Sequence, residues 1–71
     1  MNQLITINPV ELVVADEYAA EALNVLNRHN AMRINRISAF GISLLQGYVS
    51  ASDTEALLSD CANCGVDAYI R

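Results

Sequence analysis

One stretch near the C-terminus contains the signals of a complete helix, from its first residue to its last. Ser52 and Glu55 have capping-box spacing, in which a hydroxyl and a carboxylate each accept a hydrogen bond from a free backbone N–H at the start of a helix. Gly65 suits the left-handed residue that follows the last turn. We therefore expect Cys61 and Cys64 at the C-terminal end of the helix, where the negative pole of the helix dipole disfavours a thiolate.

The two cysteines allow three interpretations. Cys61 and Cys64 have the spacing of one helix face together with Leu57, so the simplest is that both fill the core between helix and sheet. A redox pair is disfavoured because no lysine or arginine adjoins them in the sequence. Two thiolates are half of a zinc site, which would need His29 and another ligand, or the cysteines of a second chain. We predict no cofactor and no metal, with these cysteines as the weak metal candidates.

The size of the chain limits what it can bury. Its 71 residues make one domain, over residues 1–71, near the lower limit for a stable core. A hydrophobic share of 54% is high for this size, so we expect part of the apolar surface to be covered by a second copy or another protein. No segment has the length of a membrane-spanning helix, and the start lacks the basic residues of a secretory signal. We expect a cytoplasmic protein with reduced thiols and no membrane contact.

The basic residues are few and unevenly distributed. Eight acids and four arginines give a net charge of −4, which argues against direct nucleic-acid binding through phosphates. Four basic side chains nevertheless fall in one short stretch without an acid: Arg28, His29, Arg33 and Arg36. If they converge, they would form an anion site for a carboxylate or a phosphate. The alternative is that they are solvated or pair with acids elsewhere in the fold, namely Glu17, Glu21 or Asp67.

Helical spacing predicts a first helix with Asp16 as its N-cap, running to His29. Asn30 can adopt the left-handed conformation that ends such a helix, and a charged His29 would complement the dipole as a C-terminal cap. The predicted apolar stripe of this helix consists of Ala19, Ala22, Leu23 and Leu26.

The segments that follow are rich in β-branched and aromatic residues. Residues 33–39 and 42–50 are predicted as two strands of a hairpin that turns at Phe40-Gly41. Ile34 and Ile37 cannot face the same side without a bulge, which we place near Arg36. Alternating apolar residues predict a half-buried final strand over 66–71.

Two interpretations of the N-terminal segment remain open. Residues 4–7 and 10–15 look like strands separated at Asn8-Pro9, because proline lacks the donor that a central strand needs. In the other interpretation Asn8 caps a long helix, with Pro9 as its first residue and Glu11 as its box partner. We favour the strands, because the valines of this segment would point away from the apolar stripe of the first helix.

The resulting order is strand, helix, strand, strand, helix, strand. It resembles the α+β ferredoxin-like βαββαβ sandwich, a two-layer fold with four antiparallel strands and two helices on one face, and the ACT-type regulatory domains that share it. ACT-type domains often place a glycine between the first strand and the first helix, where this chain has Ala15-Asp16-Glu17. The resemblance implies that the sheet face away from the helices is free to meet a partner.

No catalytic constellation is evident. The serines form no elbow or triad motif, and the three glycines are isolated, so no phosphate loop is predicted. We therefore predict a protein that is not an enzyme.

Two functions fit this outline. The first is a small interaction or inhibitor protein that dimerises or docks on a macromolecular partner through its open sheet face, for example a phage-borne protein of the anti-CRISPR type. The predicted contact residues are Leu45, Tyr48, Val49 and Tyr69. The alternative is an ACT-like sensor that holds an anionic metabolite near the basic stretch. A CxxC redox or zinc-binding protein ranks below both.

Overall fold

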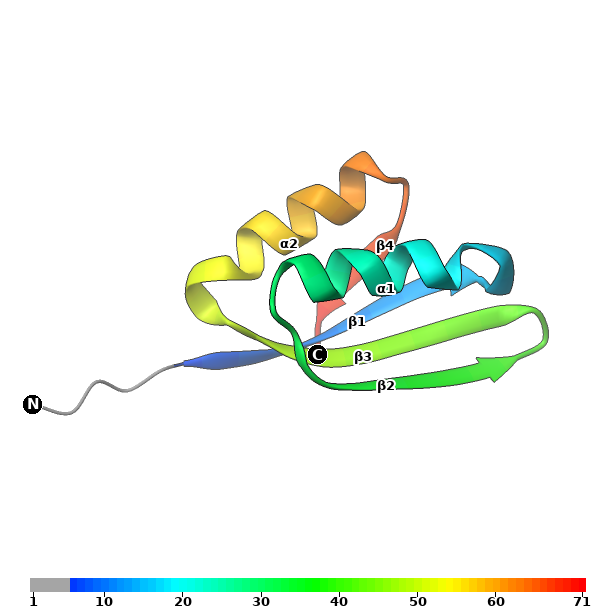
Figure 1. The fold of residues 1–71 in the computed structure, drawn as a ribbon, viewed down its shortest axis with the longest axis horizontal. Coiled ribbons are helices and arrows are strands. Elements are labelled where there is room, and N and C mark those ends of the chain that lie inside the picture. Colours follow the sequence, from blue (N-terminus) through cyan, green and yellow to red (C-terminus); the bar gives the residue numbers. More distant parts are fainter. Residues whose placement is uncertain (1–5) are drawn as a thin grey trace, which may run out of the picture.

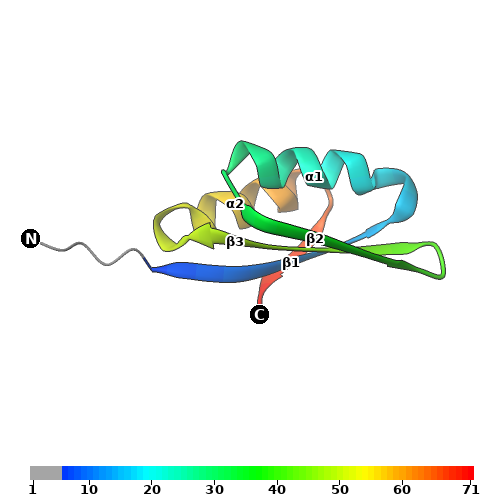
Figure 2. The same cartoon turned by 60° about the horizontal axis from the view of Figure 1, so that its bottom comes forward.

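The strands form one antiparallel sheet in the order β2-β3-β1-β4, and both helices pack on the same face of it (Figures 1 and 2). The computed structural model describes residues 6–71. The elements are β1 (Ile7–Ala15), the 3₁₀ turn η1 (Asp16–Tyr18), α1 (Ala19–Arg28), β2 (Met32–Ala39), β3 (Ile42–Ser50), α2 (Ala51–Asn63) and β4 (Asp67–Ile70). This arrangement confirms the predicted ferredoxin-like α+β fold.

The first strand runs unbroken through Asn8 and Pro9, so the predicted interruption there is wrong, as is the alternative helix. The nitrogen and the carbonyl of a strand residue point to the same side, and the Pro9 carbonyl accepts a hydrogen bond from the Arg71 N–H at 2.9 Å. The backbone nitrogen of Pro9, which has no hydrogen to donate, therefore faces the end of β4, where the pairing between β1 and β4 ends. Residues 4 and 5 of the predicted strand lie outside the described part of the chain.

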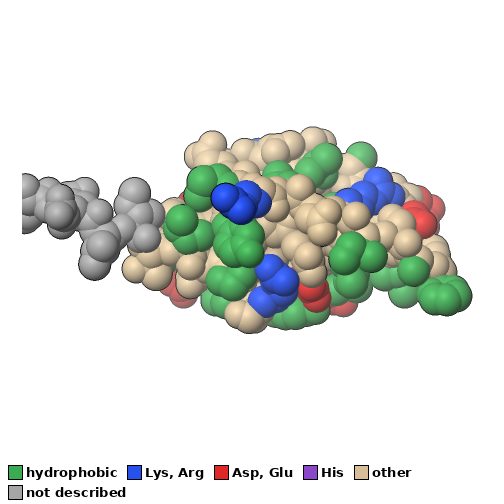
Figure 3. Space-filling model, turned by 90° about the horizontal axis from the view of Figure 1, so that it is seen from below, with side chains coloured by type: hydrophobic (Ala, Val, Ile, Leu, Met, Phe, Trp, Pro, Cys, Tyr) green, Lys and Arg blue, Asp and Glu red, His purple; other side chains and the backbone are tan. Residues whose placement is uncertain are grey.

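The register of the sheet assigns each side chain of β3 to one of two faces. Four residues face the helices and are buried: Ser43, Leu45, Gly47 and Val49. The residues between them face the open side of the sheet: Ile42, Leu44, Gln46 and Tyr48. Seen from the side of the edge strand β2, hydrophobic side chains reach the surface beside arginine side chains (Figure 3).

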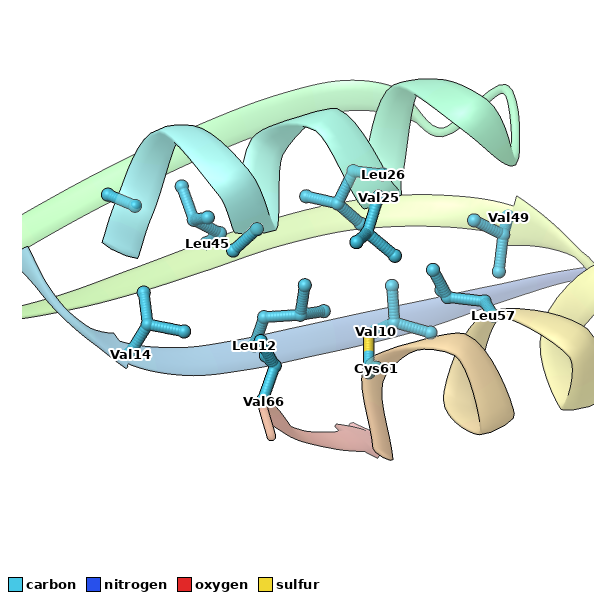
Figure 4. Packing of buried hydrophobic residues seen from close by; sticks show 12 residues of the cluster. Val10, Leu12, Val14, Val25, Leu26, Leu45, Val49, Leu57, Cys61 and Val66 are labelled. Carbon is cyan, nitrogen blue, oxygen red and sulfur yellow. The ribbon is translucent and has the colours of Figure 1, made fainter. Parts of the chain in front are cut away.

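The core lies between the sheet and the helices (Figure 4). Leu12, Leu26, Leu45 and Leu57 are its largest fully buried side chains. The predicted stripe of α1 is correct for its alanines and Leu26. Leu23, however, is 37% exposed, and the buried position belongs to Val25.

Neither helix starts with the predicted cap. Asp16 makes no capping hydrogen bond and begins the 3₁₀ turn that precedes α1. Its carboxylate instead accepts a hydrogen bond from the Ser43 hydroxyl at 2.5 Å. At α2 the N-cap is Ser50, without a side-chain cap bond, and the Thr54 hydroxyl donates to the Ser50 carbonyl at 2.8 Å. The predicted box of Ser52 is therefore absent.

The predicted helix ends are correct, whereas the predicted β-bulge lies nearer the start of β2 than expected. Asn30 and Gly65 have φ values of +56° and +74°, which confirms the left-handed residues after both helices. The β-bulge lies between Met32 and Asn35 rather than at Arg36, and it contains Arg33 with φ +53°. A left-handed conformation costs a side-chain-bearing residue about 1–2 kcal/mol, so Arg33 is a strained position of the backbone.

Candidate functional site

The structure separates the four basic residues of the predicted anion site. Arg28 and His29 end α1 and face α2. The Arg28 guanidinium donates to Asp60 at 2.9 Å, and the two ring nitrogens of His29 lie 2.9 Å from Asp53 and 3.1 Å from Asp60. We call Arg28, His29, Asp53 and Asp60 the interhelix cluster. His29 occupies the C-cap position as predicted, but its partners are acids that were not among the expected ones.

Charges in the interhelix cluster stabilise one another. The hydrogen bond from Arg28, followed by that from His29, lowers the pKa of the Asp60 carboxyl. The same contact raises the pKa of Arg28. His29 is the most enclosed member, with a side chain that is 15% exposed. Because every ionic group of the cluster has a partner within it, we assign it to holding α1 against α2.

The Arg36 side chain also has polar partners. Its Nε donates to the Ser38 hydroxyl at 3.1 Å, and a guanidinium nitrogen lies 3.9 Å from the Asp16 carboxylate. The Ser38 hydroxyl in turn lies 3.1 Å from that of Ser43, which donates to Asp16. This chain of polar contacts joins the start of η1 to the β2–β3 hairpin.

Arg33 is the one member of the predicted set that forms no ion pair with a described residue. It lines a hollow of about 430 Å³ together with Ile7, Met32 and Tyr48. We call this the edge hollow. It lies on the open side of the sheet, where Met32 and Tyr48 are opposite each other in the register of β2 and β3. A cation beside two apolar side chains and an aromatic ring suits a ligand that is anionic at one end and apolar or planar elsewhere.

A second hollow of about 460 Å³ adjoins the first through Met32. It has polar walls, formed by Arg28, His29, Asn30, Ser50, Ser52 and Asp53 as well as Met32. The predicted anion residues therefore line two neighbouring hollows, except for Arg36. Of these two hollows, only the edge hollow has a basic side chain without an acidic partner in the part of the chain that the structure describes.

The predicted partner-binding residues divide between the two faces of the sheet. Leu45 and Val49 are 1% and 0% exposed and face the helices, so the prediction that they contact a partner is wrong. Tyr48 and Tyr69 lie on the open side. The Tyr69 hydroxyl donates to Glu11, which also accepts a hydrogen bond from Gln46, and these bonds lower the pKa of the Glu11 carboxyl.

The two cysteines also differ from each other. Cys61 is fully buried beside Leu57 in the core, and burial raises the pKa of its thiol to about 11. Cys64 is exposed at the C-cap of α2, so the prediction that both fill the core is wrong for Cys64. Within residues 6–71 no three histidine, cysteine, aspartate or glutamate side chains gather in a metal-binding group, and no helix is long and apolar enough to cross a membrane.

Sequence reasoning missed two walls of the edge hollow, Ile7 and Met32. Neither residue points to a binding site by its chemistry, since isoleucine and methionine are ordinary core residues. The bulge that the imperfect alternation of β2 predicted was the available clue, because bulges often redirect side chains beside a functional site.

Comparison with known proteins supports the fold. No protein-family model and no curated protein matches this sequence. Among solved structures, the chain is similar to CPII, a nitrogen regulatory PII-like protein from Thiomonas intermedia K12, bound to ADP, AMP and bicarbonate. The TM-score is 0.79 at 8% sequence identity, and the match covers 97% of this chain and 94% of CPII. At this identity, the similarity establishes the ferredoxin-like fold alone.

Proposed function

We propose that this protein is a sensor that binds an anionic small molecule in the edge hollow and catalyses no reaction. The observation that carries this proposal is Arg33, a guanidinium without an ionic partner among the described residues, held in a left-handed conformation beside apolar walls. Strained residues concentrate at functional sites, where the surrounding structure maintains them.

Adenine nucleotides are the first ligands to test. The ligands named for CPII are ADP, AMP and bicarbonate, which are all anions in water. In this chain the Arg33 guanidinium offers a phosphate two parallel hydrogen bonds, and the Tyr48 ring and the Met32 thioether offer surfaces for a planar base. The hollow of about 430 Å³ is in the size range of small-molecule sites.

The residues around the hollow favour binding over catalysis. Among the serine and threonine hydroxyls of the described chain, the one closest to a carboxylate is that of Ser43, beside Asp16, and Ser43 is fully buried. A substrate cannot reach that hydroxyl, so this pair offers no exposed nucleophile.

Docking on a macromolecule is the second candidate. Several large apolar side chains of the hairpin are exposed, among them Ile37 at 47% and Ile42 at 48%. The comparisons give no support to the hypothesis that this protein is a phage-borne inhibitor.

Calorimetric titration with AMP, ADP and bicarbonate tests the proposed sensor. We expect a nucleotide to bind and Arg33→Ala to weaken it by roughly tenfold or more, because a charge-assisted hydrogen bond contributes about 1.5–3 kcal/mol. Arg36→Ala is the matched control and should bind normally, since Arg36 is engaged with Ser38 and Asp16. Adenosine, which lacks the phosphate, should bind more weakly than AMP. Absence of binding by all three anions, or equal binding by Arg33→Ala, would overturn the proposal.

A further inference from the structure

Phe40 stands at the tip of the β2–β3 hairpin and is fully solvent exposed, with a relative accessibility of 102%. Phe40 and Gly41 form the two-residue turn, with φ values of +55° and +77°. Such turns favour asparagine, aspartate or glycine at the first position, and a bulky residue there costs about 1–2 kcal/mol. Within its own fold Phe40 recovers none of this cost, because its side chain is in water.

The tip is held in a fixed position. The Asp16 N–H donates to the Gly41 carbonyl at 2.9 Å, and the Asp16 carboxylate accepts from Ser43 on β3. These bonds join η1 to the turn, so that Glu17, the next residue of η1, lies on the same end of the molecule as Phe40. Glu17 is exposed and forms no ion pair with a described residue. The tip therefore presents an aromatic ring with a free carboxylate nearby.

The other end of the same hairpin has complementary features. Ala39 pairs with Ile42 at the tip, whereas Met32 pairs with Tyr48 at the edge hollow. The hollow offers a thioether, a phenol ring and a guanidinium, which all contact aromatic rings favourably. Its volume of about 430 Å³ can accommodate one phenylalanine side chain, and Arg33 is a cation without an acidic partner among residues 6–71. In the view from the β2 edge, hydrophobic side chains are visible toward both ends of the molecule (Figure 3).

We propose that Phe40 of one copy inserts into the edge hollow of a second copy, with Glu17 of the first opposite Arg33 of the second. The contact joins two different surfaces of the same chain, so repetition closes a ring or continues as a filament. The proposal goes beyond small-molecule sensing and does not require it. Because a ligand and Phe40 would use the same hollow, the two would exclude each other.

Sedimentation velocity of the full chain without nucleotide, over a range of concentrations, tests this contact. We expect the protein to associate, and Phe40→Asn to reduce the association constant by tenfold or more, as for an aromatic anchor. Asparagine suits the left-handed region, so this variant should fold at least as stably as the natural chain. Arg33→Glu should weaken association similarly, because it places a carboxylate opposite Glu17. Leu23→Ala, which changes an exposed apolar residue of α1, is the control and should associate normally.

A mixture of the two variants identifies the geometry. The Arg33→Glu copy retains an intact tip, and the Phe40→Asn copy retains an intact hollow, so the mixture should form one-to-one pairs that grow no further. A natural chain that stays monomeric up to about millimolar concentration, the affinity limit of a very weak contact, would overturn the proposal. A mixture that stays monomeric would also overturn it, since a tip-to-tip or face-to-face contact would then explain the loss. Nucleotide binding is measured separately on the monomeric Phe40→Asn variant, so that failure of the sensor and failure of this contact are distinguishable.

Discussion

Arg28 and Arg33 belong to the same basic stretch of the sequence, yet they occupy different layers of the molecule. Arg28 ends a helix and meets Asp60 of the other helix at 2.9 Å. Arg33 lies in the bulge of an edge strand, beside the edge hollow and without an ionic partner in the described chain. The left-handed turn at Asn30 separates them, because it redirects the chain from the helix layer to the sheet. Proximity in sequence therefore grouped two residues to which we assign different roles, Arg28 to stability and Arg33 to the proposed binding site.

The largest expected effect on stability comes from His29→Ala. The substitution removes a nearly enclosed ring that contacts Asp53 and Asp60 and leaves Asp53 without its partner. We expect the free energy of unfolding to fall by about 2 kcal/mol, measured by urea denaturation, with nucleotide affinity unchanged. Asn27→Ala, at an exposed position of the same helix, is the control. A tenfold loss of nucleotide affinity in His29→Ala would contradict the division of roles and unite the two hollows in one anion site.

Acid should weaken the interhelix cluster. The hydrogen bonds from Arg28 and His29 hold the pKa of Asp60 below its ordinary value of 3.8 in the folded protein. A lowered carboxyl pKa stabilises the fold above the unfolded value, and this contribution is lost as the pH falls below about 3.8 toward the folded value. The urea midpoint of the natural chain should therefore decline more steeply below this pH than that of Asp60→Asn. Equal declines would show that the Asp60 contacts add nothing to stability.

Arg33→Asn is expected to have the smallest effect on stability, and one of opposite sign. Asparagine tolerates the left-handed conformation better than arginine, so the free energy of unfolding should rise by about 0.5 kcal/mol. The same substitution removes the guanidinium that we assign to the ligand. A thermal melt and a nucleotide titration of this one variant thus measure both roles. A clear loss of stability would mean that Arg33 has a structural partner.

Local signals in the sequence were sufficient for the order of the elements. Alternating apolar residues identified β3 and β4, and Asn30 and Gly65 identified the helix ends, since these preferences depend on neighbouring residues. Two of the failures involved a distant residue. Asp16 caps nothing because Ser43, on β3, takes its carboxylate. Pro9 is tolerated in a central strand because β4 ends opposite it.

The candidate site was less predictable than the fold. The basic stretch contained Arg33, the arginine of the proposed site, but the acids that pair with its neighbours come from α2 and η1, and no spacing rule connects them. The faces of β3 were assigned incorrectly for Leu45 and Val49, because alternation identifies two faces and does not say which one the helices cover.

The positions of the two cysteines provide an internal measure of unfolding. Cys64 is exposed and should react with an alkylating reagent at any time, whereas Cys61 is buried with a thiol pKa of about 11 and should react only when the chain opens. Mass spectrometry after a short pulse of reagent would thus separate folded molecules with a single adduct from opened molecules with two. Counting adducts in this way would report the opened fraction of every variant described above, without an added probe.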